Sequence, residues 1–237
     1  MLGIWSNFGA VIVGGILGTL LRGGIPEKYR LIVNQGLGLC VLLIGVSGAI
    51  ATEHTIVVIV SVVAGAFLGE RLGIERGLDK MGAFAQRKLG GGDEGFATGF
   101  VNATLLFCVG AMAVVGSLNA GLADDPDTLL AKSALDGVSA VIFASSFGPG
   151  VIFAAIPMTL YQGGIALLAG VLRPLLTDTI IAEMSATGSV LIIGLAVNML
   201  GLGKDRIRVA NMLPAMFIPC LYFPLADWIA GVIRAIG

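Results

Sequence analysis

Long stretches without any charged residue are the feature that most constrains how this chain folds. Seven of them are separated by short segments in which the charges cluster, and they cover residues 1–21, 31–52, 55–69, 95–123, 137–172, 184–203 and 209–226. A helix needs about 20 mostly apolar residues to cross the hydrocarbon core of a bilayer. The sequence therefore predicts a bundle of membrane-spanning helices.

Composition supports this prediction and excludes several other classes of protein. Charged residues make up 12% of the chain, against about 25% in an ordinary soluble domain. A soluble globule must keep many of its residues in contact with water, so this composition excludes an ordinary soluble enzyme. The net charge of −1 also provides no basic surface for phosphates. We expect the lipid bilayer as the main partner and no nucleic acid.

The longest charge-free stretch, 137–172, is too long for one helix and contains Gly148-Pro149-Gly150. Proline removes a backbone donor and disfavours helix before itself, so we divide the stretch there. The fold expected is all-α, a polytopic bundle of about eight spans, with seven as the alternative. The spans are predicted near 3–21, 31–51, 55–72, 96–118, 129–147, 150–172, 185–202 and 209–235.

Prolines inside two of these spans predict kinked or broken helices. Pro157 lies in the sixth span, and Pro214, Pro219 and Pro224 lie in the last. Each one frees a backbone carbonyl that must find another partner. Whether the last segment is one span or two stays open.

The chain, 1–237, is expected to form a single membrane domain with short internal matches. Val33-Asn34 before Cys40-Val41 recurs as Val101-Asn102 before Cys108-Val109, and Asn211 enters the last helix in a similar way. These matches suggest repeats around 1–72, 95–172 and 185–237. Chance similarity in an apolar chain is the alternative. The three cysteines follow no metal or disulfide spacing, and we interpret them as small apolar packing residues.

Basic residues predict which side of the membrane each loop faces. If the N-terminus is outside, 11 of the 14 Lys and Arg residues fall on the inner side, as the excess of basic residues in cytoplasmic loops requires. Both termini are then outside and the number of spans is even. The longest inner loop predicts a short amphipathic helix over 73–90, which either lies on the inner membrane surface or packs against the bundle.

The fifth predicted span carries the strongest candidate site. Polar residues recur on one side at spacings of three and four: Lys132, Ser133, Asp136, Ser139 and Ser146. Charged groups at membrane depth are costly and are functional candidates by default. In one interpretation this face lines a path in which Asp136 binds a cation or a proton. In the other, Lys132 extends to the outer interface and pairs with Asp136, while the serines bond to backbone carbonyls.

Four amides are weaker candidates. Asn34, Asn102 and Asn211 each lie near the inner end of a predicted helix, and Gln162 lies in the middle of the sixth span. They are predicted either to contact a solute or to link helices, which is the commoner use of such amides. Catalysis is not expected because the chain lacks the known nucleophile, P-loop and metal-ligand motifs. We expect no cofactor and no metal site.

Several segments resemble the bacterial YqgA/YdfK-type inner-membrane proteins. They are Asn102 to Met112, Gly116 to Leu118, Lys132 to Gly137 and Ala210 to Pro214. The resemblance covers nearly the whole chain and implies a multi-pass protein of the bacterial plasma membrane. The family is a domain of unknown function, so the resemblance implies no substrate.

These observations together favour a transporter or channel for a small solute or ion. The alternative is a membrane scaffold or an accessory subunit that transports nothing. A homo-oligomer stays open in either case.

Overall fold

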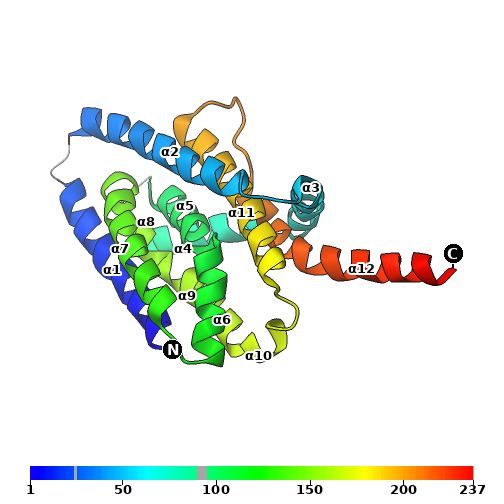
Figure 1. The fold of residues 1–237 in the computed structure, drawn as a ribbon. Helices are drawn as coiled ribbons and strands as arrows, with labels where there is room; N and C mark the ends of the chain where they lie inside the picture. The colour runs from blue at the N-terminus through cyan, green and yellow to red at the C-terminus, as the bar shows by residue number, and fades with distance from the viewer. Residues whose placement is uncertain (24–25, 90–94, 237) are drawn as a thin grey trace.

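A computed structural model describes residues 1–23, 26–89 and 95–236, and all regular structure in these ranges is helical (Figure 1). The helices in chain order are α1 (Leu2–Arg22), α2 (Glu27–Ala49), α3 (Thr55–Leu72), α4 (Ile74–Leu89), α5 (Phe96–Cys108), α6 (Ala111–Leu122), α7 (Asp127–Phe147), α8 (Gly150–Phe153), α9 (Ala155–Leu167), α10 (Ala169–Leu172), α11 (Asp178–Leu200), the 3₁₀ helix η1 (Val209–Phe217) and α12 (Ile218–Ile236). The all-α prediction is confirmed.

The number of spans also agrees with the prediction. Seven helices or joined helices are long and apolar enough to cross a membrane, and the bent pair α5–α6 makes an eighth if it is one span. Their order matches the eight predicted segments. The body of the bundle holds α1 and α5 to α11, while α12 projects away from it (Figure 1).

The predicted fourth span is broken in the middle, which the sequence analysis did not anticipate. The axes of α5 and α6 differ by 64°, and the break lies at Val109 and Gly110. Gly110 has φ +120° and ψ 151°, a conformation that residues with a Cβ rarely adopt. Val109 is extended. The glycine therefore permits a sharp change of direction without any proline.

Breaks in the other two predicted spans lie close to their prolines. The sixth span is divided into α8, α9 and α10, and Pro157 lies in the first turn of α9, where its missing N–H costs no helical bond. The last span begins as the nine-residue 3₁₀ helix η1, which contains Pro214. Long 3₁₀ segments are uncommon and often mark a hinge. The prediction of kinked or broken helices is confirmed.

Loops far apart in the sequence meet at the two ends of the bundle. At one end, the N-terminal ammonium group lies 2.7 Å from Asp124 in the α6–α7 turn. At the other, the 201–208 loop reaches the α3–α4 turn, where Arg208 lies 2.7 Å from Glu70 and Arg206 lies 3.9 Å from Glu75. The loops rich in basic residues are thus separated from the acidic α6–α7 turn by the length of a helix.

Small residues let α1 and α7 pack backbone against backbone. A Cβ added at Gly14 would collide with the carbonyl oxygen of Gly137, and one at Gly18 would collide with that of Val141. Ala10 continues this face and would lie 3.3 Å from a Cβ at Gly137. Such small residues four apart form a groove for a neighbouring helix. This pair of glycines therefore serves packing within the chain.

Two further pairs of glycines four residues apart also allow close backbone packing within the chain. Gly65 and Gly69 of α3 pack against the backbone of η1 at Ala215 and Asn211. Gly95 and Gly99 lie against Phe147 at the end of α7. All three glycine pairs therefore join elements that are distant in the sequence.

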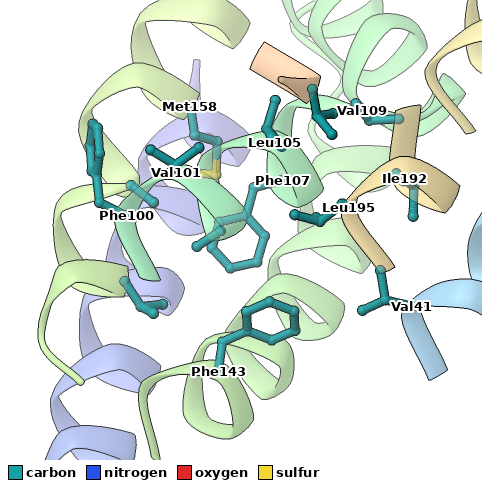
Figure 2. Close-up of a cluster of buried hydrophobic side chains, with 14 of the residues drawn as sticks. Val41, Phe100, Val101, Leu105, Phe107, Val109, Phe143, Met158, Ile192 and Leu195 are labelled. Atoms are coloured by element: carbon teal, nitrogen blue, oxygen red, sulfur yellow. The ribbon is translucent and has the colours of Figure 1, made fainter. Parts of the chain in front are cut away.

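A continuous apolar core fills the space among α2, α5, α7, α9 and α11 (Figure 2). Phe107 is fully buried and Phe143 is 3% exposed; both point toward the same region, near Leu195 of α11 (Figure 2). Phe143 also packs against Phe147 at the end of α7, with 5.7 Å between the ring centroids.

Helix α4 confirms the predicted helix over 73–90, although the end at Gly90 lies outside the described residues. It contacts α5, α3 and η1, and its Glu75 is 8% exposed. Glu75 is therefore buried against the bundle, as one of the two interpretations requires, while Arg76 and Gly77 in the same turn are exposed.

The glycine groove predicts opposite effects for the same substitution at two positions of α1. Gly14→Ala should lower the free energy of unfolding by about 1–3 kcal/mol, because the new methyl group would overpack the α1–α7 contact. Gly9→Ala should raise it by up to about 1 kcal/mol, since nothing lies within 4 Å of that position and alanine favours helix. Unfolding in detergent, followed by circular dichroism, measures both. Equal effects at the two positions would show that the groove does not determine stability.

Candidate functional site

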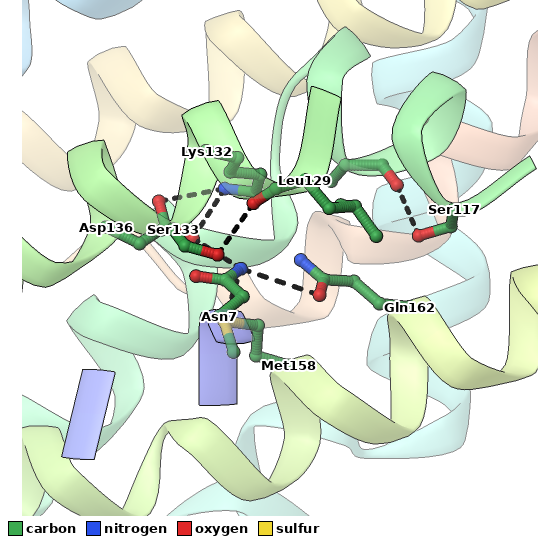
Figure 3. Close-up of polar contacts among 9 residues, drawn as sticks. Asn7, Ser117, Leu129, Lys132, Ser133, Asp136, Met158 and Gln162 are labelled. Carbon is green, nitrogen blue, oxygen red and sulfur yellow. Dashed lines mark hydrogen bonds and ion pairs between the residues drawn. The ribbon is translucent and has the colours of Figure 1, made fainter. Parts of the chain in front are cut away.

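The strongest candidate predicted from the sequence is an ion pair buried inside the bundle. Lys132 and Asp136 lie one turn apart on α7, and the Lys132 Nζ is 2.7 Å from one Asp136 oxygen and 2.9 Å from the other. Their side chains are 7% and 9% exposed. Lys132 therefore points inward to its partner and does not extend to the surface of the protein (Figure 3).

Two amides from other helices complete this polar cluster. Asn7 of α1 donates from Nδ2 to Asp136 Oδ2 at 2.9 Å, and the same group lies 3.5 Å from Oε1 of Gln162 on α9. Met158, one turn before Gln162, places its sulfur 3.4 Å from Asn7 Nδ2. Asn7, Gln162 and Met158 are all fully buried. We call Lys132, Asp136, Asn7 and Gln162 the ionic cluster (Figure 3).

The ionic cluster contains two polar atoms that have no hydrogen-bond partner among the described residues. Asn7 Oδ1 is an unused acceptor and Gln162 Nε2 is an unused donor. Buried polar atoms are nearly always paired, because leaving one unpaired costs about 1–3 kcal/mol. A buried donor and a buried acceptor beside an ion pair can therefore receive a small polar molecule.

Of the predicted serines, Ser133 follows the structural interpretation and Ser146 does not. Ser133 on α7 donates to the carbonyl of Leu129 at 2.6 Å, and Ser117 on α6 bonds to its own helix in the same way (Figure 3). Ser139 is partly buried, and Ser146 is 6% exposed with a hydroxyl that has no partner among the described residues. Of the predicted polar face, only Lys132 and Asp136 belong to the ionic cluster.

The break between α5 and α6 lies near the ionic cluster. Cys108, the last residue of α5, is close enough for the charges of both Lys132 and Asp136 to act on it. At the start of α6, the N–H of Ala111 bonds to Ser185 Oγ of α11 at 3.2 Å. Within the described residues, no backbone N–H bonds to the carbonyls of residues 106–108. The break thus leaves backbone groups near the buried ion pair without helical hydrogen bonds.

Asn102 lies at a pocket on the other side of the aromatic core. This pocket has a volume of about 390 Å³ and lies between α5, the end of α7 and the 201–206 loop. Its lining includes Thr98, Asn102, Phe147, Asn198, Lys204 and Arg206. Asp136 lines neither this pocket nor two others, of about 530 and 440 Å³, near Glu70 and near Phe223.

Asn34 and Asn211 lie elsewhere and do not join Asn102. Asn211 donates to Glu70 at 2.6 Å and accepts from the N–H of Glu75 at 2.7 Å, so it ties η1 to the α3–α4 turn. Asn34 is half-buried on α2, with an Oδ1 that has no partner among the described residues. The three predicted inner-side ligands, Asn34, Asn102 and Asn211, therefore lie at three separate places.

Glu183 of α11 is a buried acid that the sequence analysis placed outside the spans. It is 1% exposed, and its carboxylate accepts from Thr52 Oγ1 at 2.5 Å and from the N–H groups of Glu53 and His54 at 3.0 and 3.2 Å. These donors belong to the turn that leads into α3, where His54 is the N-cap residue. A carboxylate at a helix N-terminus is stabilising, so Glu183 caps α3 from another helix.

Sequence reasoning missed Asn7 as well as Glu183. Asn7 shares the helix face of Gly14 and Gly18, seven and eleven positions later, and that shared face is the signal that could have placed it against α7. Nothing local identifies the partners of Glu183. In the ranges that the structure describes, no group of three or more His, Cys, Asp or Glu side chains could hold a metal ion.

The cap predicts a specific loss of stability. Glu183→Gln should lower the free energy of unfolding by about 1–3 kcal/mol, because charge-assisted hydrogen bonds to the start of α3 become neutral ones. Glu53→Gln removes an exposed carboxylate next to the same turn and should change it by less than about 0.5 kcal/mol. Chemical denaturation in detergent compares the two. An unchanged free energy of unfolding in Glu183→Gln would rule out the cap.

Glu75 predicts a pH-dependent attachment of α4. Burial raises the pKa of this carboxyl group, against the opposing effects of Arg206 and the Ala210 N–H. A raised folded-state pKa means that the stability from the proton is present at low pH and is lost as pH rises through that pKa. The stability of the wild type relative to Glu75→Gln should therefore fall as the pH rises above 4.5, the ordinary pKa of a glutamate.

Melting temperatures measured at increasing pH follow this difference, and Glu53→Gln, at an exposed acid in the α2–α3 turn, is the matched control. A difference that stays constant, or that grows with pH, contradicts the prediction.

Comparison with known proteins places the whole chain in one family. It is 33% identical to "Uncharacterized protein YqgA" of Escherichia coli (strain K12) over 236 residues, which cover 97% of this chain and 98% of that protein. It is 30% identical to "Uncharacterized membrane protein YdfK" of Bacillus subtilis (strain 168) over 224 residues, or 92% and 94% of the two chains. No solved structure matches significantly. The model of the family "Protein of unknown function (DUF554)" matches residues 2–223, and this chain therefore belongs to the DUF554 family.

Proposed function

We propose that this protein moves a small solute or ion across the bacterial plasma membrane and that the ionic cluster is its binding site. The observation that carries the proposal is the Lys132–Asp136 pair, buried among helices that are apolar enough to span a bilayer. Replacing a buried ion pair by apolar residues is often neutral or even stabilising. Stability alone therefore does not explain why two charges are buried inside the bundle. Binding of a polar solute would explain them.

The rest of the bundle supports a path to this site from the end that carries the basic loops. The pocket beside Asn102 and Arg206 opens at that end, and Phe147 in its wall is about 16 Å from Asp136 along α7. Phe143 lies between these two positions along α7, and its ring packs against that of Phe147 with 5.7 Å between the ring centroids. We interpret this arrangement as a closed conformation, because Asp136 lines none of the three pockets.

Broken helices provide the joints that opening this path requires. The α5–α6 break lies beside the ionic cluster, and α9, which carries Gln162, begins and ends at breaks. In transporters, substrate sites often form where spanning helices are interrupted, because free backbone groups there bind charge. A transporter that alternates between closed and open conformations fits these features better than a permanently open channel.

The basic loops suggest the orientation of the protein. Since 11 of the 14 Lys and Arg residues fall at one end of the predicted topology, that end should face the cytoplasm and both termini should face outward. Solute would then enter the pocket beside Asn102 from the cytoplasm, or leave through it.

The proposal predicts that transport can be lost while the fold is kept. The double variant Lys132→Met/Asp136→Leu replaces the ion pair with apolar side chains of similar size but takes the carboxylate partner from Asn7. Its free energy of unfolding should therefore stay within about 1–3 kcal/mol of that of the wild type, and it should transport nothing. Purified protein in liposomes is tested with gradients of protons, Na⁺ and K⁺ and with radiolabelled pools of amino acids, amines and organic acids.

Asp124→Asn is the matched control, because it removes a carboxylate from an ion pair that is exposed; it should transport like the wild type. If the wild type moves none of these probes, or if the folded double variant still moves one, the proposal is wrong. A stoichiometric partner that copurifies with an inactive wild type would instead favour the scaffold.

A further inference from the structure

The hydrogen-bonding groups of the ionic cluster indicate which class of solute it would bind. This step rests on the proposed function and adds to it the chemistry of the solute. The cluster contains one cation, one anion and two neutral amides, and Lys132 and Asp136 neutralise each other at 2.7 Å. A bare cation would displace or repel the Lys132 ammonium group, and a bare anion would face the Asp136 carboxylate. Neither would leave the buried charges balanced.

The two unused atoms belong to the two amides of the cluster, which also contact each other through Asn7 Nδ2 and Gln162 Oε1. Asn7 binds Asp136 through Nδ2, so its free acceptor, Oδ1, belongs to an amide that is already fixed at the anionic end. Gln162 has a free donor, Nε2. Both side chains are fully buried, so bulk water does not satisfy these atoms. The cluster thus offers a second acceptor in addition to a carboxylate, and a second donor in addition to an ammonium group.

We infer that the ionic cluster binds a small zwitterion that has an ammonium group and a carboxylate, as an α-amino acid does. The solute's ammonium group takes the place of Lys132 at Asp136 and donates also to Asn7 Oδ1. Its carboxylate accepts from Lys132 Nζ and Gln162 Nε2. Every charge keeps an opposite partner and all four cluster residues gain or keep a hydrogen bond, so the net charge of the site stays at zero.

The surroundings of the cluster limit the size and polarity of this solute. Met158, Leu129 and Phe143 are buried and apolar, and Asp136 lines none of the three pockets described above. In the closed conformation the Lys132–Asp136 contact fills the place that the solute would take. A small amino acid with an uncharged side chain would fit once the pair separates, because it brings no further charge into an apolar core.

Matched probes test this class of solute. Proteoliposomes are given a radiolabelled mixture of α-amino acids with uncharged side chains, and then the amines and the carboxylic acids that lack one of the two charged groups. We expect uptake of at least one amino acid and at least about tenfold weaker uptake of its amine and its acid, since each analogue loses charge-assisted hydrogen bonds. Transport of amines, acids or inorganic ions without amino acids would overturn the inference and leave the proposed function standing. No transport of any probe would overturn both.

Single substitutions should change which of the three probes, the amino acid, its amine or its carboxylic acid, is preferred. A purely structural ion pair would not produce this outcome. Lys132→Met leaves Asp136 without its cation and should turn the preference from the amino acid to the corresponding amine. Asp136→Asn should turn it to the corresponding carboxylic acid. Gln162→Leu should reduce uptake of the amino acid and of the carboxylic acid, but not uptake of the amine. Unchanged selectivity in these variants would contradict the inference.

Since the single variants bury an unpaired charge and could fail to fold, a binding measurement on the folded wild type completes the test. The transported amino acid should raise the melting temperature of the detergent-solubilised wild type and of Asp124→Asn, because a ligand stabilises the state that binds it. It should not raise that of Lys132→Met/Asp136→Leu. An equal rise in the double variant would place the amino acid elsewhere and refute the assignment.

Discussion

The contact between α1 and α7 is the interaction on which the rest of the structure depends. Gly14 and Gly18 let the two backbones approach until only glycine fits, and this approach fixes the register of one helix against the other. The same register places Asn7, two turns earlier on α1, at hydrogen-bond distance from Asp136. Packing and polar chemistry are therefore set by one helix face, and a change in the groove would also move the ionic cluster.

Several polar groups in this bundle stabilise the fold, and they differ in kind from the ionic cluster. Glu183 has a complete set of partners at the start of α3, and Asn211 uses both ends of its amide between Glu70 and Glu75. Asn198 likewise bonds to both the N–H and the carbonyl of Ile207. The ionic cluster instead keeps an unused donor and an unused acceptor. This contrast, rather than burial by itself, distinguishes the ionic cluster from these three structural contacts.

The break between α5 and α6 lies near the buried charges, whereas the matching segment of α2 has no break. At the end of α5, Gly110 turns the chain by 64° beside Lys132 and Asp136. The corresponding match in α2 has Leu42 after Cys40-Val41, and that helix continues to Ala49 without a break. The two matched segments therefore differ at the residue that permits the turn. Of these two helices, only α5 is interrupted near the charges.

The sequence by itself determined the helical membrane bundle, the order and approximate limits of its eight predicted spans, the helix predicted over 73–90 and the one-turn spacing of Lys132 and Asp136. These features depend on hydropathy along the chain and on neighbours one helical turn apart, which are local. Only the tertiary structure decided that Asn7 and Gln162 join the ion pair, that Glu183 caps α3, and that Asn34, Asn102 and Asn211 lie apart. Those contacts depend on which faces of distant helices meet, and in a chain with 36 glycines many faces could pack closely. The break at Gly110 was hidden for the same reason, because a glycine needed for a turn looks like any other until its backbone angles are known.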